Sequence, residues 1–262
     1  MLPLRRSRLL FSALLVGSLA PDFPYFFLMT ARPAIGHSVE GLFRFCLPTG
    51  LAVLWLFHAI VKRPLADLAP AFIRSRISEA DLEFHFWPLS RLLRILGSLL
   101  VGSITHILWD GFTHDHGYFV KAWPLLRERV LAVPRQPPIF KLLQFGCSGL
   151  GVAIVIWVAW RVWRNKSLSP NPVGAKLGPV WRGVAAAMIV FAGAAVGVAE
   201  GIERSYHHLG WRACVIDGVI FSITAFCAAV VAYSLVWHAF GVSGKQKPLD
   251  HEAQGLEVPA QR

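Results

Sequence analysis

The chain has 262 residues, of which 55% are hydrophobic and 16% are charged, and its formal net charge is +11. Soluble domains carry roughly 25% charged residues, so this composition argues against an ordinary soluble domain and predicts a polytopic membrane protein. The bases lie in connections between apolar segments, where they suit anionic lipid, and no nucleic-acid-binding motif accompanies them. We therefore expect membrane lipid as a partner and no nucleic acid.

The first apolar segment, residues 9–20, is short and resembles either a signal peptide or a membrane helix. Three bases precede it: Arg5, Arg6 and Arg8. We expect the segment to be retained, because cleavage after Ala20 would place Asp22 next to a new terminus. Residues 21–40 contain three prolines and are expected to form a loop rather than a regular helix. The prolines are Pro21, Pro24 and Pro33.

Five further apolar segments predict membrane helices, because about 20 apolar residues span the hydrocarbon core. They are residues 42–61, 92–109, 142–163, 184–199 and 214–240. The polar connections at 62–94 and 110–141 are expected to be loops, the first with a helix on the membrane surface. The fold class is thus an all-α integral membrane bundle of about six helices. It forms a single domain over residues 1–240, with a polar, disordered tail at 241–262.

The distribution of bases predicts the orientation of the chain. The connection at 161–182 carries five bases and no acid, which is typical of a cytoplasmic loop. With six segments, both termini are then cytoplasmic. The connection at 110–141 also carries five bases, so the opposite orientation stays open.

In either orientation, six segments bring many ionisable residues to one membrane face. These residues are Asp22, His37, His106, Asp110, His114, His116, Glu200, Glu203, His207 and His208. An ionisable residue in or beside a membrane segment is by default a functional-site hypothesis. This convergence is the main argument for a site.

His106 and Asp110 carry the most specific signal, because residues four apart share one helix face. A neutral imidazole and a carboxylate at that spacing can bind one cation, although they can also simply tie helices together. Asp22 and His37 are expected to complete the metal site, the alternatives being a turn residue and a solvated side chain. His114 and Glu203 are candidates for moving protons, and solvation is the alternative for Glu203.

Four stretches of the sequence resemble a bacterial membrane family of unknown function, domain-of-unknown-function family 4184. They read APDFPYFF, HSVEGLFRFCLPTGL, GSITHILWDGFTHDHGYFV and LLQFGCSGLG. That family is in turn similar to the membrane-bound metal-dependent hydrolases, whose shared elements match Asp22, His37, His106 and Asp110. The resemblance implies a bacterial inner-membrane location. Members usually carry a Ser-His-Pro element ahead of the first helix, and this chain departs from that pattern with MLPLRR.

Together these observations predict a membrane-embedded hydrolase that uses a divalent metal, with zinc favoured and manganese or iron possible. A site at the membrane interface suggests a lipid or phosphoester substrate. The alternative is a scaffold or a small-solute transporter in which the histidines and aspartates pair with one another. Transporters often contain internal repeats, and none is visible here, which favours the scaffold among these two.

Overall fold

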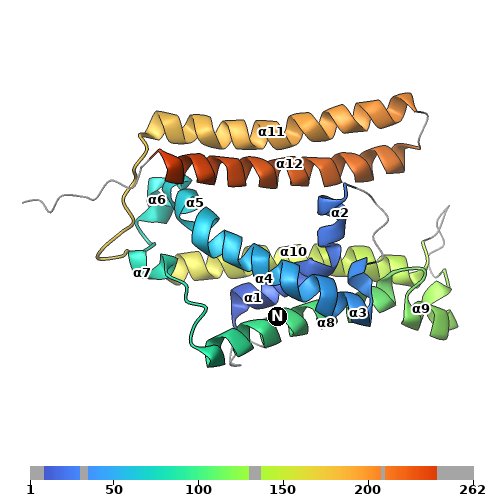
Figure 1. The fold of residues 1–262 in the computed structure, drawn as a ribbon. Helices are drawn as coiled ribbons and strands as arrows, with labels where there is room; N and C mark the ends of the chain where they lie inside the picture. The colour runs from blue at the N-terminus through green and yellow to red at the C-terminus, as the bar shows by residue number, and fades with distance from the viewer. Residues whose placement is uncertain (1–8, 30–34, 130–136, 208–209, 241–262) are drawn as a thin grey trace, which may run out of the picture.

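The computed structural model describes residues 9–29, 35–129, 137–207 and 210–240, and all regular elements among them are helices. Five stretches are long and apolar enough to cross a membrane, and a shorter apolar one covers Phe11–Phe27. The five are Val39–Leu68, Leu89–Ala122, Ile139–Asn165, Pro179–Tyr206 and Trp211–Ala239. The protein is therefore an all-α, multi-pass membrane bundle, as the sequence predicts (Figure 1).

Some sequence predictions concern residues outside the described ranges. These are the arginines at positions 5, 6 and 8, Pro33, His208 and the tail at 241–262.

The expected loop after residue 20 is wrong for its first part, because the chain stays helical to Phe27. Helix α1 (Phe11–Leu19) continues into the 3₁₀ turn η2 (Ala20–Asp22) and then into α2 (Phe23–Phe27). Pro21 and Pro24 each lie in the first turn of their element. A first turn does not use its N–H groups, so proline is tolerated there.

The second membrane stretch begins earlier and ends later than the apolar run. It joins α3 (Val39–Gly41), the π-helical η4 (Leu42–Cys46), α4 (Leu47–Leu56), the π-helical η5 (Phe57–Val61) and α5 (Lys62–Leu68). Each π segment contains the residue four before a proline, Pro48 or Pro64, where a regular helix would meet a clash. Pro64 leaves the Ile60 carbonyl without its usual donor, and Nε2 of His238 approaches that oxygen at 3.0 Å.

The third membrane helix is also longer than expected. Helix α8 spans Leu89–Thr113, so it carries His106 within the helix and Asp110 in its last turn. The preceding connection contains α6 (Ala71–Arg74) and α7 (Glu79–Leu82). The following connection contains α9 (Tyr118–Ala122) and the 3₁₀ helix η6 (Pro124–Arg127), which corrects the expected loop there.

The last three helices are α10 (Ile139–Asn165), α11 (Pro179–Tyr206) and α12 (Trp211–Ala239). Helices α11 and α12 lie side by side, and α10 exposes almost all of its length, with Phe140 its one buried residue. In Figure 1 the C-terminal ends of α8 and α11 lie on the same side of the molecule. The regions of His114 and Glu203 are therefore on the same side of the bundle, in keeping with alternating spans.

Close packing of α1 against α8 sets the geometry on which the site depends. A Cβ atom added to Gly17 would lie 2.3 Å from the Leu99 carbonyl oxygen, and one added to Gly102 would lie 2.4 Å from that of Leu14. The two backbones can approach this closely only because neither glycine has a side chain. Ser103 Oγ also donates to the Gly17 carbonyl at 2.8 Å. This contact fixes the register of the two helices.

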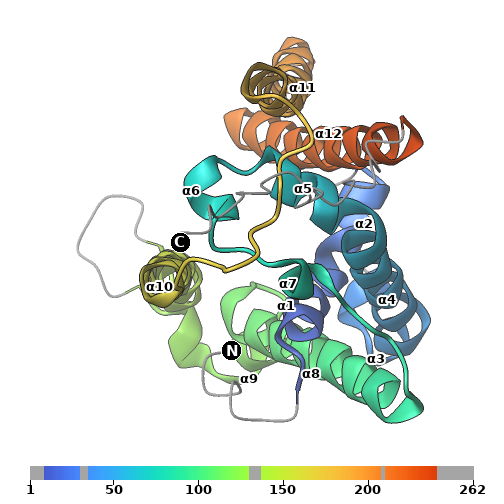
Figure 2. The ribbon, with the colours of Figure 1, turned by 90° about the vertical axis from the view of Figure 1, so that its left-hand side faces the viewer.

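At the opposite side of the bundle, the connection after α10 passes the chain around α7 and leads into α11 (Figure 2). The backbone N–H groups of Ser169 and Val173 donate to the carbonyls of Ser75 and Ile77. Two connections that the sequence places on one membrane face are thus bonded to each other.

Candidate metal centre

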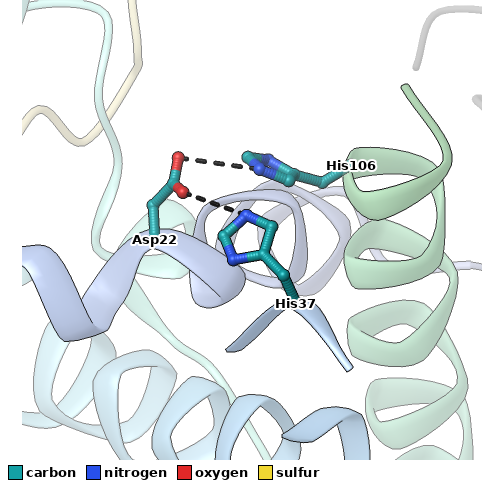
Figure 3. Close-up of side chains that lie close together, drawn as sticks. All are labelled: Asp22, His37 and His106. Carbon is teal, nitrogen blue, oxygen red and sulfur yellow. Dashed lines mark ion pairs between the residues drawn. The ribbon is translucent and has the colours of Figure 1, made fainter. Parts of the chain in front are cut away.

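The four expected ligands lie on three separate elements, which helix packing brings together. Asp22 ends η2, and His37 ends η3 (Ile35–His37). His106 and Asp110 lie one turn apart on α8. Figure 3 shows the side chains of Asp22, His37 and His106 pointing toward one another.

Asp22, His37 and His106 offer ligand atoms that all lie within 4.8 Å of one another, and Asp110 lies beside the two histidines. His37 Nε2 lies 3.5 Å from Asp22 Oδ1 and 3.1 Å from Asp110 Oδ2. His106 Nε2 lies 3.6 Å from Asp22 Oδ2 and 3.2 Å from Asp110 Oδ2. Ligand atoms on neighbouring corners of a tetrahedral zinc shell lie about 3.3 Å apart, given zinc–ligand bonds of about 2.0–2.1 Å. The four separations bracket that value.

The tautomer of His106 is determined by a backbone contact. Its Nδ1 lies 2.7 Å from the carbonyl oxygen of Ser18, which can only accept, so Nδ1 carries the hydrogen. In a neutral ring, Nε2 is then an acceptor. A backbone partner of this kind is the usual second contact of a metal-ligating histidine.

The cluster contains more acceptors than donors. Nε2 of His106, an acceptor in the neutral ring, faces carboxylate oxygens of both Asp22 and Asp110. The side chains are between 18% and 35% exposed, so water screens them only partly. Facing acceptors repel one another, so the arrangement requires a cation or an additional proton at its centre. Mixed histidine and aspartate donors suit zinc and also manganese or iron.

Of the two residues expected to move protons, His114 lies next to this cluster and Glu203 does not. Nδ1 of His114 is 3.5 Å from Asp110 Oδ1. Glu203 is exposed on α11, and no contact in the described part of the chain joins it to the four ligands. Its neighbour Glu200 pairs with Arg204, which also contacts Asp217 on α12. Those charges join α11 to α12.

Three structural features of the site were not foreseen from the sequence. The carbonyl of Ser18 orients His106, and Gly36 lets η3 approach η2. The third is Gln144 on α10, whose amide lies 3.4 Å from His114. A polar amide inside an apolar membrane segment was the one available signal for it.

Comparison with known proteins identifies a family but no activity. No curated protein and no solved structure matches the chain. A family described as a domain of unknown function (DUF4184) matches residues 1–235. That range covers every described helix except the end of α12, together with all four candidate ligands. The chain therefore belongs to the DUF4184 family.

Proposed function

We propose that this protein is a membrane-embedded, metal-dependent hydrolase whose ligands are Asp22, His37, His106 and Asp110. The observation that carries the proposal is that Nε2 of His37 and Nε2 of His106 each lie 3.1–3.6 Å from an oxygen of Asp22 and from Oδ2 of Asp110. Residues 22 and 110 are far apart in sequence, and only the helix packing brings them together. Their spacing suits zinc, and manganese or iron would accept the same donors.

A bound divalent metal would supply Lewis acidity and lower the pKa of a water to about 7, the chemistry needed to hydrolyse an ester or phosphoester. The two aspartates provide negative charge to hold the cation. His106 is oriented by Ser18, so its Nε2 lone pair is available to the site. His114, beside Asp110, is placed to accept or return a proton.

A lipid or phosphoester is the proposed substrate class. Asp22 lies in the shorter apolar helix Phe11–Phe27, and the cluster stays partly exposed. Large apolar side chains nearby in sequence are also exposed, including Phe27 and Trp109. Such surroundings suit a substrate with an apolar part and a polar, hydrolysable head. Membrane lipid is accordingly the natural partner of this face.

We also propose a bacterial inner-membrane location with both termini in the cytoplasm. The support is the connection at 161–182, which holds five bases and no acid. The candidate metal centre then faces the periplasmic side, at the end of α8 away from that connection.

A non-enzymatic scaffold is the second candidate, and one observation favours it. His37 and His106 lie 3.1 and 3.2 Å from the same oxygen of Asp110, which is within hydrogen-bonding range. A pair of protonated imidazoles could satisfy the carboxylates without a metal and tie η3 to α8. The two candidates differ in whether amide side chains can replace the ionisable ones.

Elemental analysis of the purified full chain tests the proposal. We expect near-stoichiometric metal in the native protein and its loss in the double variant His106→Ala, Asp110→Ala, with folding confirmed by circular dichroism. The matched control is Glu83→Ala, His85→Ala, which removes an exposed acid and an exposed histidine elsewhere. It should keep its metal. Absence of metal from the native protein, after loading with zinc and manganese, would overturn the hydrolase proposal.

A second variant separates the two candidates. His106→Asn combined with Asp110→Asn preserves hydrogen-bonding groups but removes good metal ligands. A scaffold should retain its thermal midpoint in this variant. A metal enzyme should lose both the metal and metal-dependent hydrolysis of a phosphodiester such as bis(p-nitrophenyl) phosphate, if that probe is turned over by the native chain.

A further inference from the structure

The two oxygens of Asp110 face different partners. Oδ2 lies toward His37 and His106, at 3.1 and 3.2 Å, inside the candidate metal centre. Oδ1 lies 3.5 Å from Nδ1 of His114, one turn further along α8. A carboxylate divided in this way has one oxygen available as a ligand and one available for orientation. Oδ1 is held in place only if Nδ1 of His114 carries a hydrogen that it can donate to this oxygen.

The surroundings of Nδ1 of His114 are acceptors. Besides Asp110 Oδ1, the hydroxyl oxygen of Thr113 lies 3.3 Å from this nitrogen. The Thr113 hydroxyl donates its hydrogen to the Trp109 carbonyl, also at 3.3 Å, so its oxygen is left to accept. Two acceptors around one nitrogen require that nitrogen to carry the hydrogen.

The surroundings of Nε2 of His114 independently indicate the same tautomer. Nε2 lies 3.4 Å from the amide nitrogen of Gln144, on the first turns of α10. The orientation of that amide is set by Lys141, whose ammonium group donates to Gln144 Oε1 at 2.8 Å. A lysine can only donate, so the amide oxygen faces Lys141 and the amide N–H₂ faces His114. Nε2 of His114 is therefore the acceptor.

We propose that Gln144, oriented by Lys141, is a positioning residue for Asp110. It holds His114 in the Nδ1–H tautomer, which donates to the outer oxygen of Asp110 and leaves Oδ2 directed at the cluster. His114 then orients a ligand and supplies no lone pair of its own to the site, so this role replaces the proton transfer proposed for it above. The consequence for metal affinity rests on the proposed function, whereas the tautomer does not.

The location of Gln144 supports a specific role. Helix α10 is apolar and largely exposed, and an amide on such a helix is unfavourable unless it is hydrogen-bonded. Outer partners of metal ligands commonly change metal affinity by about 10–100-fold when they are removed. A hydrogen bond that only joined α10 to α8 would set the same tautomer of His114. The effect of Gln144 on metal affinity therefore distinguishes positioning from simple helix attachment.

Two variants at one position test the inference in the full chain. Gln144→Glu keeps the length of the side chain but replaces the donor facing Nε2 by an acceptor. Gln144→Met keeps the length and removes hydrogen bonding. The matched control is Ser148→Asp, which adds a carboxylate one turn further along α10, where the exposed Ser148 hydroxyl donates to the Gln144 backbone carbonyl.

The first measurement is nitrogen-15 NMR of histidine-labelled protein without metal, at a pH where exposed imidazoles are neutral. The His114 signal is assigned by its loss in His114→Phe. We expect Nδ1–H and a bare Nε2 in the native chain and in Ser148→Asp, and a hydrogen on Nε2 in Gln144→Glu. A native Nε2–H form, or a bare Nε2 in Gln144→Glu, would overturn the inference.

The second measurement is titration with Co²⁺ as a spectroscopic substitute for zinc. We expect Gln144→Met to bind about tenfold more weakly than the native chain. Native-like affinity in Gln144→Met overturns the positioning role. If the native chain binds no Co²⁺ or Zn²⁺ while its His114 is Nδ1–H and responds to Gln144→Glu, the hydrolase proposal fails and the orientation of Asp110 by Gln144 is supported.

Discussion

Gly36 packs against Pro21 so closely that a Cβ atom on the glycine would lie 2.1 Å from the proline carbonyl oxygen. This contact holds η3 against η2 and places His37 next to Asp22, with 3.5 Å between Nε2 and Oδ1. The glycine is therefore needed for the site although it supplies no ligand atom.

Gly36→Ala is expected to weaken metal binding about tenfold or more, because the new methyl group displaces η3 and the His37 ring with it. Isothermal titration with zinc measures the effect. The control is Gly97→Ala, where an added Cβ atom meets nothing within 4 Å. Equal zinc affinities for Gly36→Ala and the native chain would contradict this account of the site.

Gly102→Ala is expected to lower the free energy of unfolding by about 1–3 kcal/mol, the usual range for overpacking. Its Cβ atom would lie 2.4 Å from the Leu14 carbonyl oxygen, so α1 must move away from α8. Unfolding in mixed detergent micelles measures the change. Gly146→Ala, on the exposed side of α10, has open space around the added atom and should keep native stability.

Asp67→Ala is expected to destabilise the fold by about 2 kcal/mol or more, because it leaves the buried indole N–H of Trp237 unsatisfied. Asp67 is 2% exposed and accepts from the backbone N–H of Lys176 at 2.6 Å and from the indole N–H of Trp237 at 3.1 Å. Glu79→Ala removes an exposed carboxylate from the same side of the bundle and is the control. The same unfolding assay applies, and two equal small losses would argue against the buried bonds.

Acid is expected to weaken the contact between the two connections through Asp81. The Ser78 backbone N–H and the Lys166 ammonium group, each at 2.9 Å, lower the pKa of the Asp81 carboxyl from 3.8 to about 2. Because the pKa is lower in the folded state, the stabilisation is complete above about pH 4 and is lost as the pH falls toward 2.

Asp81→Asn should therefore reduce the decline in stability between pH 4 and pH 2. Thermal midpoints measured across that range report it. Asp115→Asn, at an exposed carboxylate on the other side of the bundle, should decline as the native chain does. Identical declines for Asp81→Asn and the native chain would show that the Ser78 and Lys166 contacts do not stabilise the fold.

The helix boundaries differ from those that the sequence predicts. The prolines at 21 and 24 predict a loop, yet each lies in a first turn, where no N–H is needed. Pro48 and Pro64 are accommodated by π-helical segments just before them. Proline identity is visible in a sequence, but its position within a turn depends on where the preceding helix ends.

The candidate site illustrates a similar division. The spacing of His106 and Asp110 places them on one helix face without any knowledge of the fold. Asp22 and His37 reach this pair only through two close glycine contacts. Gly17 packs against Leu99 of α8, and Gly36 packs against Pro21 of η2. The orienting carbonyl of Ser18 belongs to the backbone, which has no signature in the sequence.

By itself, the sequence determined the membrane class, the apolar spans and the side of the bundle on which the ionisable residues gather. These follow from the hydrophobic effect, which acts on composition and period alone. Only the tertiary structure decided which of those residues meet, because a contact of about 3 Å depends on the register between helices. It brought Gln144, oriented by Lys141, to His114 and left Glu203 exposed on α11, since side-chain contacts are set by backbone approach and not by residue type.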